Sequence, residues 1–326
     1  MKYFRSLLLL IMAILLGNRV QSQPVSFEYD KTPAGSGFKM EGYWVWCGSV
    51  IKVDSLYHLF ASRWPKTGPF PEGYKTHSEI VRATSKSPMG PYRFEEVVIG
   101  ERDSIFWDSN MAHNPTIQKI GDEYVLFYIG SDFTTCQDGS TALLRRTGYA
   151  VSKSIDGPWI RSDRPVIDTE SNNPALLVDR KGVKLMYRDA KLRIYMAEAE
   201  TYKGPFSITN DNVWPACRLE DFYLFRAGNQ YHMICEDNTG GVSGHERWGV
   251  HLCSGNGTDG WRAYSPPVVY NHEIQLTNDS ILRLVRRERP QLLIENHQIT
   301  HLVTSAYDGK DAWSQPVRLK RPIPVD

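Results

Sequence analysis

The sequence predicts an all-β fold, a five-bladed β-propeller, and three observations lead to it. A hairpin unit of strand, polar turn and strand occurs five times along the chain. A second unit, in which a strand leads into a turn that ends in Gly and an aromatic residue, follows the first four hairpins. No convincing amphipathic helix occurs after the N-terminal segment. Recurring four-stranded antiparallel units are typical of propeller blades.

The hairpins are the most regular feature of the chain. Each joins two apolar strands through a polar turn, such as Gly121-Asp122-Glu123 or Ala227-Gly228-Asn229. Tyr, Leu, Phe and Val dominate the second strand, and this composition around a Gly- and Asn-containing turn predicts a β-hairpin. The five hairpins begin at residues 49, 115, 174, 222 and 290.

The second unit supplies the outer half of a blade. A strand such as Phe94–Ile99 returns after the turn. The fifth unit lacks a full second half, and Val25–Tyr29 is the candidate strand that closes the ring from the other terminus. A β-sandwich is the alternative, but sandwiches do not repeat this combination in register. The unit covers residues 82–92, 149–159, 195–206 and 251–261.

The N-terminus predicts export. Residues 1–22 combine a basic start, an apolar run from Leu7 to Leu16 and a small-residue cleavage site ending at Ser22, the order found in secretory signal peptides. The apolar run is too short to span a bilayer, and no later stretch is suited to anchor the chain. We therefore expect residues 23–326 to form one domain, monomeric, secreted or periplasmic, and without a membrane anchor.

Composition narrows the partners. The chain has 326 residues, 41% of them hydrophobic and 23% charged, with a formal charge of +1, so nothing favours nucleic acid or an anionic membrane as a partner. Five cysteines occur without CxxC or Cys/His spacing, which argues against a zinc site. We favour the interpretation that most of these cysteines are small buried residues of strands. An exported protein would also permit one disulfide bond between them. The cysteines are Cys47, Cys136, Cys217, Cys235 and Cys253.

Polar residues stand just before each hairpin. The first strand of a blade lines the central channel, so these residues should converge at one mouth of the ring. The alternative to a functional role is that Asn172-Asn173 only forms a turn and that each charged pair only forms a structural salt bridge. Carboxyl groups from two blades facing one channel shift each other's proton affinity. The candidates are Trp46, His113, Asn114, Asn173, Glu220, Asp221, Glu288 and Arg289.

Residues near the ends of the second strands extend this set. Aromatic and arginine side chains at a rim suit a sugar, since they offer a flat apolar face and charged donors. A solvated salt bridge is the alternative for each of them. The additional candidates are Arg63, His77, Glu79, Arg188, Asp189 and the pair Glu236-Asp237.

The segment from His113 to Tyr128, the Ser-x-x-Gly-Pro-aromatic turns and the run Glu220–Phe225 together resemble the five-bladed glycosidases of glycoside hydrolase families 43, 32 and 117. The pattern covers nearly the whole chain after the signal. Family 43 enzymes carry Asp, Asp and Glu on blades one to three, whereas this chain has Gly48-Ser49, His113-Asn114 and Asn172-Asn173 there. The usual carboxylates are therefore not carried over.

The resemblance implies a secreted glycoside hydrolase acting on a polysaccharide or oligosaccharide. We predict Glu220 as general acid and Asp221 or Glu288 as base, with the other candidates binding substrate. A histidine such as His113 is the alternative general acid, because imidazole titrates near neutral pH.

Two other functions remain open at this point. One is a non-catalytic glycan-binding propeller of a polysaccharide-utilisation system. The weaker one is a lyase or phosphorylase, for which Arg286–Arg289 is the candidate phosphate cluster. No cofactor is expected; a channel calcium would need several converging oxygen ligands, and no dedicated loop motif for one is visible.

Overall fold

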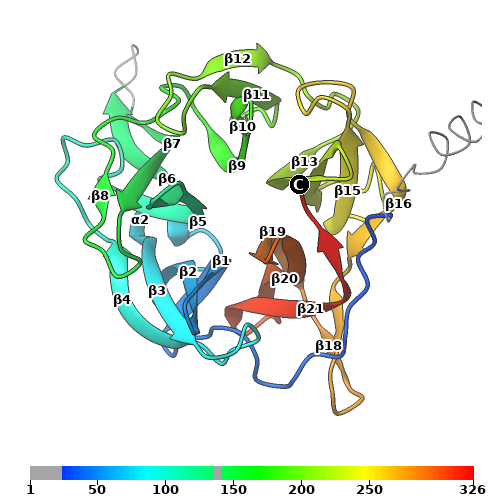
Figure 1. Ribbon diagram of the computed structural model, residues 1–326. Coiled ribbons are helices and arrows are strands. Elements are labelled where there is room, and N and C mark those ends of the chain that lie inside the picture. Colours follow the sequence, from blue (N-terminus) through cyan, green and yellow to red (C-terminus); the bar gives the residue numbers. More distant parts are fainter. Residues whose placement is uncertain (1–23, 136–140) are drawn as a thin grey trace, which may run out of the picture.

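The computed structural model describes residues 24–135 and 141–326, and the predicted signal peptide and Cys136 lie outside these described residues. Five sheets surround a central axis (Figure 1). This confirms the nearly all-β, five-bladed β-propeller that the repeats predict. Within the described ranges the α-helix is a single turn, α2 (Tyr74–His77). No helix of the described residues is long and apolar enough to cross a membrane.

The strands follow one another from the axis outward in each blade. Blade one contains β1 (Tyr43–Val53), β2 (Leu56–Pro65), β3 (Glu79–Ser85) and β4 (Arg93–Ile99). Blade two contains β5 (Met111–Ile120), β6 (Glu123–Thr135), β7 (Thr141–Ser152) and β8 (Ile160–Arg161). Blade three contains β9 (Asn172–Asp179), β10 (Gly182–Arg188), β11 (Ile194–Ala199) and β12 (Ser207–Asn210).

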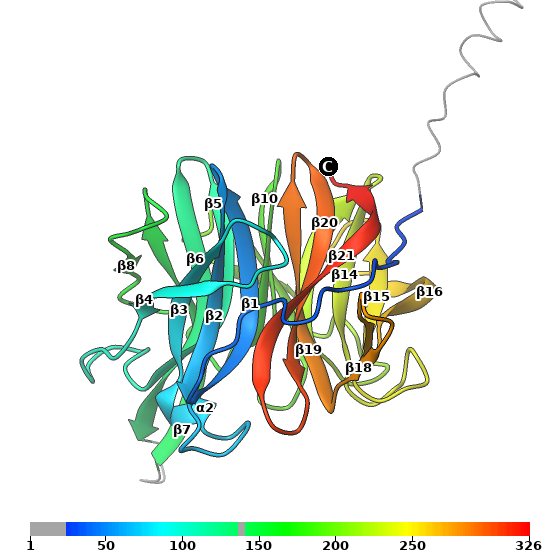
Figure 2. The same ribbon diagram turned by 90° about the horizontal axis from the view of Figure 1, so that it is seen from below.

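Blade four contains β13 (Leu219–Ala227), β14 (Gln230–Asp237), β15 (Trp248–Ser254) and β16 (Arg262–Tyr270). Blade five contains β19 (Arg286–Glu295), β20 (Gln298–Tyr307) and β21 (Ala312–Pro324). The hairpin of β17 (Glu273–Gln275) and β18 (Ile281–Arg283) lies between them in the chain. Figure 2 shows α2 and the start of β7 at the same edge of the ring.

The N-terminal segment completes blade five. Tyr29 bridges Leu319 and Phe38 bridges Ser314, so the segment runs along β21 (Figure 1). The predicted contact of Val25–Tyr29 with the last blade is confirmed at Tyr29. The pairing consists of isolated bridges rather than a regular strand, because Pro33 and two glycines with positive φ lie between the bridges.

The core lies between the blades. The second strand of every blade carries a fully buried apolar side chain, and each such burial contributes about 1.5–3 kcal/mol. Apolar faces of adjacent blades pack on one another, so the inner strands are held around the axis at fixed positions. The five central side chains are Leu59, Leu126, Leu185, Met233 and Leu302.

Each inner strand contains a β-bulge near its start. The polar residues predicted to precede the strands lie inside them, because β1 begins at Tyr43 rather than at Ser49, and the other inner strands also begin earlier. A bulge adds one residue to a strand and re-aims its side chains. The bulge residues all have positive φ: Cys47 58°, Asn114 57°, Asn173 53°, Asp221 60° and Arg289 55°.

This repetition corrects one assignment. The position in blade one that is equivalent to Asn114 and Asn173 is Cys47, not Gly48-Ser49. A non-glycine residue in this conformation costs of order 1–3 kcal/mol and persists where surrounding structure determines it. The five blades therefore impose the same local backbone at the mouth of the channel.

Candidate functional site

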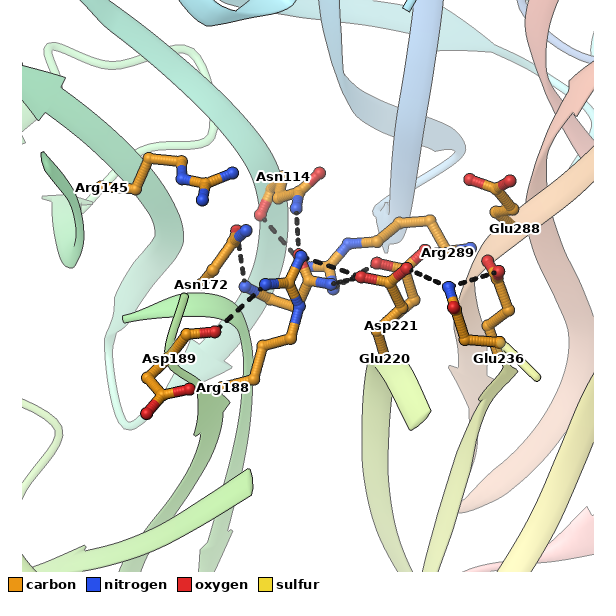
Figure 3. Close-up of polar contacts among 12 residues, drawn as sticks. Asn114, Arg145, Asn172, Arg188, Asp189, Glu220, Asp221, Glu236, Glu288 and Arg289 are labelled. Carbon is orange, nitrogen blue, oxygen red and sulfur yellow. Dashed lines mark hydrogen bonds and ion pairs between the residues drawn. The ribbon is translucent and has the colours of Figure 1, made fainter. Parts of the chain in front are cut away.

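The bulge on β13 turns two consecutive side chains toward the axis. On a regular strand Glu220 and Asp221 would point to opposite faces, but both lie at the channel mouth (Figure 3). The same shift of register pairs Glu220 with Glu236 on β14. Blade four thus contributes three carboxyl groups to one place, and Glu288 on β19 adds a fourth from blade five.

The carboxyl groups form a tight cluster. Oxygens of Asp221, Glu236 and Glu288 lie within 4.8 Å of one another, and all three residues are buried. Asn238 joins Glu220 to them, since its Nδ2 donates to Glu220 Oε1 at 2.6 Å and to Glu236 Oε1 at 3.5 Å. We refer to Glu220, Asp221, Glu236 and Glu288 as the axial carboxyl cluster.

Burial raises the pKa of two members of the cluster. Desolvation raises the pKa of Asp221 to about 7, against the opposing effect of Arg289 and with added repulsion from Glu220 and Glu288. Desolvation and the neighbouring Glu288 also raise the pKa of Glu236 well above its usual range. Within the described part of the chain, Glu236 Oε2 has no hydrogen-bond partner. Both groups favour the protonated form.

Arginines also contact the cluster, and Arg247 Nη1 lies 2.9 Å from Glu236 Oε1. Arg188 Nη2 lies 2.8 Å from Glu220 Oε2. Glu288 Oε1 accepts from Arg247 Nη1 at 3.0 Å and from Arg286 Nε at 2.5 Å. The contacts to Glu220 and Glu288 are charge-assisted hydrogen bonds and ion pairs. The salt-bridge alternative therefore applies to both, yet both carboxylates face the common axis.

The bulge residues of blades one to three are neutral and bonded to one another. Cys47 Sγ donates to Asn114 Oδ1 at 2.6 Å, and Asn114 Nδ2 donates to Asn173 Oδ1 at 2.9 Å. Asn173 Nδ2 then reaches Glu220 Oε2 at 3.5 Å. We call Cys47, Asn114 and Asn173 the neutral arc. Arg289 lies between this arc and the cluster, with its backbone N–H donating to Asp221 Oδ2 at 3.1 Å.

His113 is fixed as a neutral ring. Its Nδ1 lies 2.8 Å from Ser78 Oγ, and its ring stacks on Tyr74 with centroids 4.4 Å apart. Burial and the nearby Arg289 lower the pKa of His113 well below its usual range. The histidine acid stays a prediction, and the buried contacts of His113 favour its neutral ring. Trp46 packs beside it in the same aromatic group, 5.1 Å from Phe70 by ring centroids.

Four residues predicted to bind substrate make their described contacts outside the axial carboxyl cluster. Arg63 and Glu79 form an ion pair at 2.7 Å on blade one. Asp189 Oδ1 accepts two backbone N–H groups and so caps the turn after β10. His77 is exposed at the end of α2. In the described contacts of these four side chains, no hydrogen bond or ion pair reaches the axial carboxyl cluster.

The arginine run of blade five is not one basic patch. Arg286 and Arg289 face the cluster, whereas Arg287 turns to the other side of the strand and donates to Thr304 Oγ1 at 3.1 Å. Alternation along β19 separates Arg287 from Arg286, and the bulge at Arg289 turns that side chain back to the axial side. The run therefore does not form the phosphate pocket that a phosphorylase would need.

Asn238, Arg145 and Arg247 are not among the candidates predicted from the sequence. Glu236 was considered only as one of a pair with Asp237. Asp237 serves the following loop, since its Oδ2 accepts the N–H of Val242 at 2.9 Å. The four described cysteines are free thiols, three of them buried, as the favoured interpretation predicted.

Comparisons place the fold among known enzymes. No family model and no curated protein sequence match this chain. Among solved structures, Zg3597, a family 117 glycoside hydrolase of the marine bacterium Zobellia galactanivorans, matches with a TM-score of 0.64 and 15% identity over 90% of this chain and 89% of that chain.

Two further structures are similar. The catalytic domain of a Coprinopsis cinerea GH62 α-L-arabinofuranosidase matches with a TM-score of 0.64 and 14% identity over 92% of this chain and 99% of that one. A thermostable family-43 glycoside hydrolase matches with a TM-score of 0.62 and 14% identity over 91% of this chain and 98% of that one. The resemblance to families 43 and 117 is confirmed at the level of fold: this is a five-bladed β-propeller of the kind found in those glycoside hydrolases.

Proposed function

We propose that the protein is a glycoside hydrolase whose acid and base are carboxyl groups at the channel mouth. The axial carboxyl cluster carries this proposal. Desolvation raises the pKa of Asp221 and Glu236, whereas Glu220 pairs with Arg188, and Glu288 pairs with Arg286 and shares Arg247 with Glu236. Neighbouring titratable groups whose environments differ in this way supply the acid and the base of a reaction.

The environments favour an exchange of the roles that the sequence suggested. Asp221, with a pKa of about 7, is suited to protonate the leaving oxygen. Glu288 is suited to attack the anomeric carbon, and Glu220, the more exposed carboxylate, to contact a sugar hydroxyl. Oxygens of Asp221 and Glu288 lie within 4.8 Å, closer to the separation of about 5–5.5 Å in retaining enzymes than to the 6.5–9.5 Å of inverting ones.

The balanced reaction has two steps. Glu288 forms a bond to the anomeric carbon while the bond to the leaving oxygen breaks and Asp221 gives that oxygen its proton. Asp221 then takes a proton from water, whose oxygen displaces Glu288 and restores both carboxyl groups. The net reaction consumes one water and retains the anomeric configuration.

Incubation of the purified protein with a panel of plant and host glycans tests the proposal, with released sugar as the readout. Asp221→Asn and Glu288→Gln should each lower release by about 10²–10⁴-fold. Glu273→Gln is the matched control, because its carboxylate is half exposed and pairs with Arg283 away from the axis. Unchanged release in both variants would overturn the assigned roles.

A non-catalytic glycan-binding propeller is the second candidate. It is favoured by the neutral arc, which occupies the blades where family 43 carries its carboxylates, and by the ion pairs on Glu220 and Glu288. Binding of a glycan from the same panel without release of sugar supports this candidate over the hydrolase.

We also propose that the protein acts outside the cytoplasm, on the strength of residues 1–22. Mass spectrometry of the chain recovered from its native host tests this. A mature N-terminus at Gln23 in the exported fraction is expected, and an intact Met1 in the cytoplasm would contradict it.

A further inference from the structure

Two arginine side chains flank the channel mouth on blades two and three. The backbone N–H of Ser171 donates to the carbonyl of Arg145 on β7 at 2.9 Å, and Arg188 on β10 pairs with Asn172 in the sheet. Arg145 and Arg188 therefore lie beside two consecutive residues of the chain, and Figure 3 shows both arginine side chains near Asn172. Their side chains are 20% and 11% exposed, so both guanidinium groups reach the mouth.

Neither guanidinium is used up by its protein partner. Arg145 directs Nε and Nη2 at a single oxygen, Glu170 Oε1, both at 3.0 Å, and Nη1 at the neutral Tyr74 hydroxyl at 3.3 Å. Arg188 contacts Glu220 through Nη2 and donates from Nη1 to the carbonyl of Asp189 at 3.2 Å, and its buried Nε has no hydrogen-bond partner among the described residues. A guanidinium carries five N–H donors in a planar fork, so both groups keep donors for a ligand.

The charge around the mouth is unbalanced below neutral pH. Asp221 and Glu236 favour the protonated form there, which leaves more guanidinium groups than carboxylates. In a partly buried site such an excess attracts anions. The cations are Arg145, Arg188, Arg247, Arg286 and Arg289, and the carboxylates are Glu170, Glu220 and Glu288.

We propose that the saccharide bound at this site carries an anionic group, a carboxylate or a sulfate ester, and that Arg145 and Arg188 bind it. This inference rests on the proposed function, because that function makes the ligand a sugar. It deepens that function by naming the class of glycan. The anionic group lies over blades two and three, and the glycosidic bond lies over the axial carboxyl cluster on blades four and five.

Calorimetry with matched glycans tests the inference. Tetragalacturonic acid is compared with the same tetramer after reduction of its carboxyl groups, and a carrageenan tetrasaccharide with its desulfated form. The acidic member of at least one pair should bind about tenfold or more tightly than its neutral counterpart. This difference should shrink in about 0.5 M NaCl, since salt screens partly exposed charges.

Variants assign the effect to the two arginines. Arg145→Gln should weaken binding of the acidic member about tenfold and leave the neutral member unchanged, whereas Arg188→Gln should weaken the acidic member more than the neutral one, because it also removes the partner of Glu220. Arg93→Gln removes the same charge from a side chain that is 84% exposed on β4, and it should bind like the unmodified protein. Thermal unfolding checks that Arg188→Gln, which removes the partner of Glu220, still folds; Arg145→Gln leaves that pair intact.

The outcomes separate this inference from the proposed function. Equal affinity within both pairs, or binding of neither member, overturns the acidic class. Cleavage of neutral glycans without charge preference keeps the hydrolase and overturns the acidic class. Binding of an acidic glycan without release of sugar keeps the acidic class and overturns the hydrolase. The pair that shows the difference decides between carboxylate and sulfate.

Discussion

Two halves of the axial ring share one backbone and differ in chemistry. In blades one to three the bulge residues are the neutral arc of Cys47, Asn114 and Asn173, each bonded to the next. In blades four and five they are Asp221 and Arg289, a buried carboxyl and a buried guanidinium. All five residues have φ between 53° and 60°. The fold therefore fixes where these side chains point and leaves their chemistry free.

The two halves also differ in the pH at which their side chains change charge. Burial raises the pKa of the Cys47 thiol well above its usual range, so this end of the ring stays neutral. Burial raises the pKa of Asp221 only to about 7, so the other end changes charge near neutral pH. The comparison predicts that mutations in the charged half have larger effects than equivalent ones in the neutral arc.

The largest effect is expected at Arg289, whose side chain is 1% exposed. Arg289→Ala removes the cation next to Asp221 and leaves the carbonyls of Asn114 and Pro174 without its Nη2 donor. Breaking a buried charge pair costs about 3–5 kcal/mol. Urea denaturation measures the free energy of unfolding, with Arg93→Ala as the exposed control. A loss of less than about 1 kcal/mol would show that the two halves are equally tolerant.

The second effect is a pH dependence. The pKa of Asp221 is about 7 in the folded protein and lower when unfolded, so the folded state holds a proton that the unfolded state has released. Stability from this group is full below about pH 4 and is lost as the pH rises through about 7, by up to about 1.4 kcal/mol per pH unit. Asp221→Asn should flatten the fall in unfolding free energy between about pH 5 and 7. Glu236 contributes with the same sign, so part of the slope remains. Identical slopes for both proteins would contradict the shift.

A smaller effect is expected in the neutral arc. Asn114→Ala breaks the hydrogen bonds from Cys47 and to Asn173 and puts alanine at a φ of 57°. Unsatisfied buried partners and the strained backbone together should cost about 2 kcal/mol. Chemical denaturation measures this cost. A loss larger than that of Arg289→Ala would reverse the order of the halves.

The smallest effect concerns Cys47 itself. A serine hydroxyl can donate to Asn114 Oδ1 as the thiol does, so Cys47→Ser should change the unfolding free energy by less than about 1 kcal/mol. Cys47→Ala cannot donate and should be less stable than the serine variant. Thermal unfolding of the pair compares them, and equal stability would mean that this hydrogen bond contributes nothing.

The blades were predictable because their signals are local. An apolar strand, a polar turn and a second strand stand within one short segment, and the repeat needs no knowledge of distant contacts. The bulges were not predictable in the same way. Cys47, Asn114, Asn173, Asp221 and Arg289 share one backbone conformation without sharing a residue type, and none of them is glycine. Their conformation comes from the packing of whole blades.

Glu236 illustrates the consequence for the site. Counted from the turn, where Ala227 pairs with Gln230 and Tyr223 with Ile234, Glu220 would face Asp237. The bulge shifts the register by one residue, so Glu220 faces Glu236 instead. A shift of one residue moves a side chain to the other face of the sheet. Sequence reasoning could name the pair Glu236-Asp237 but could not choose between them.

The strap from Tyr29 to Phe38 also sets an order for folding. It pairs with β21, which is the last strand of the chain, so the earliest described segment to leave the ribosome has its partner in the final fifteen or so residues. Loop closure over nearly the whole chain must precede this contact. If the protein is exported N-terminus first, the strap crosses the membrane before β21 does. It then stays unpaired until β21 arrives. The ring therefore closes only after β21 has been synthesised and transported.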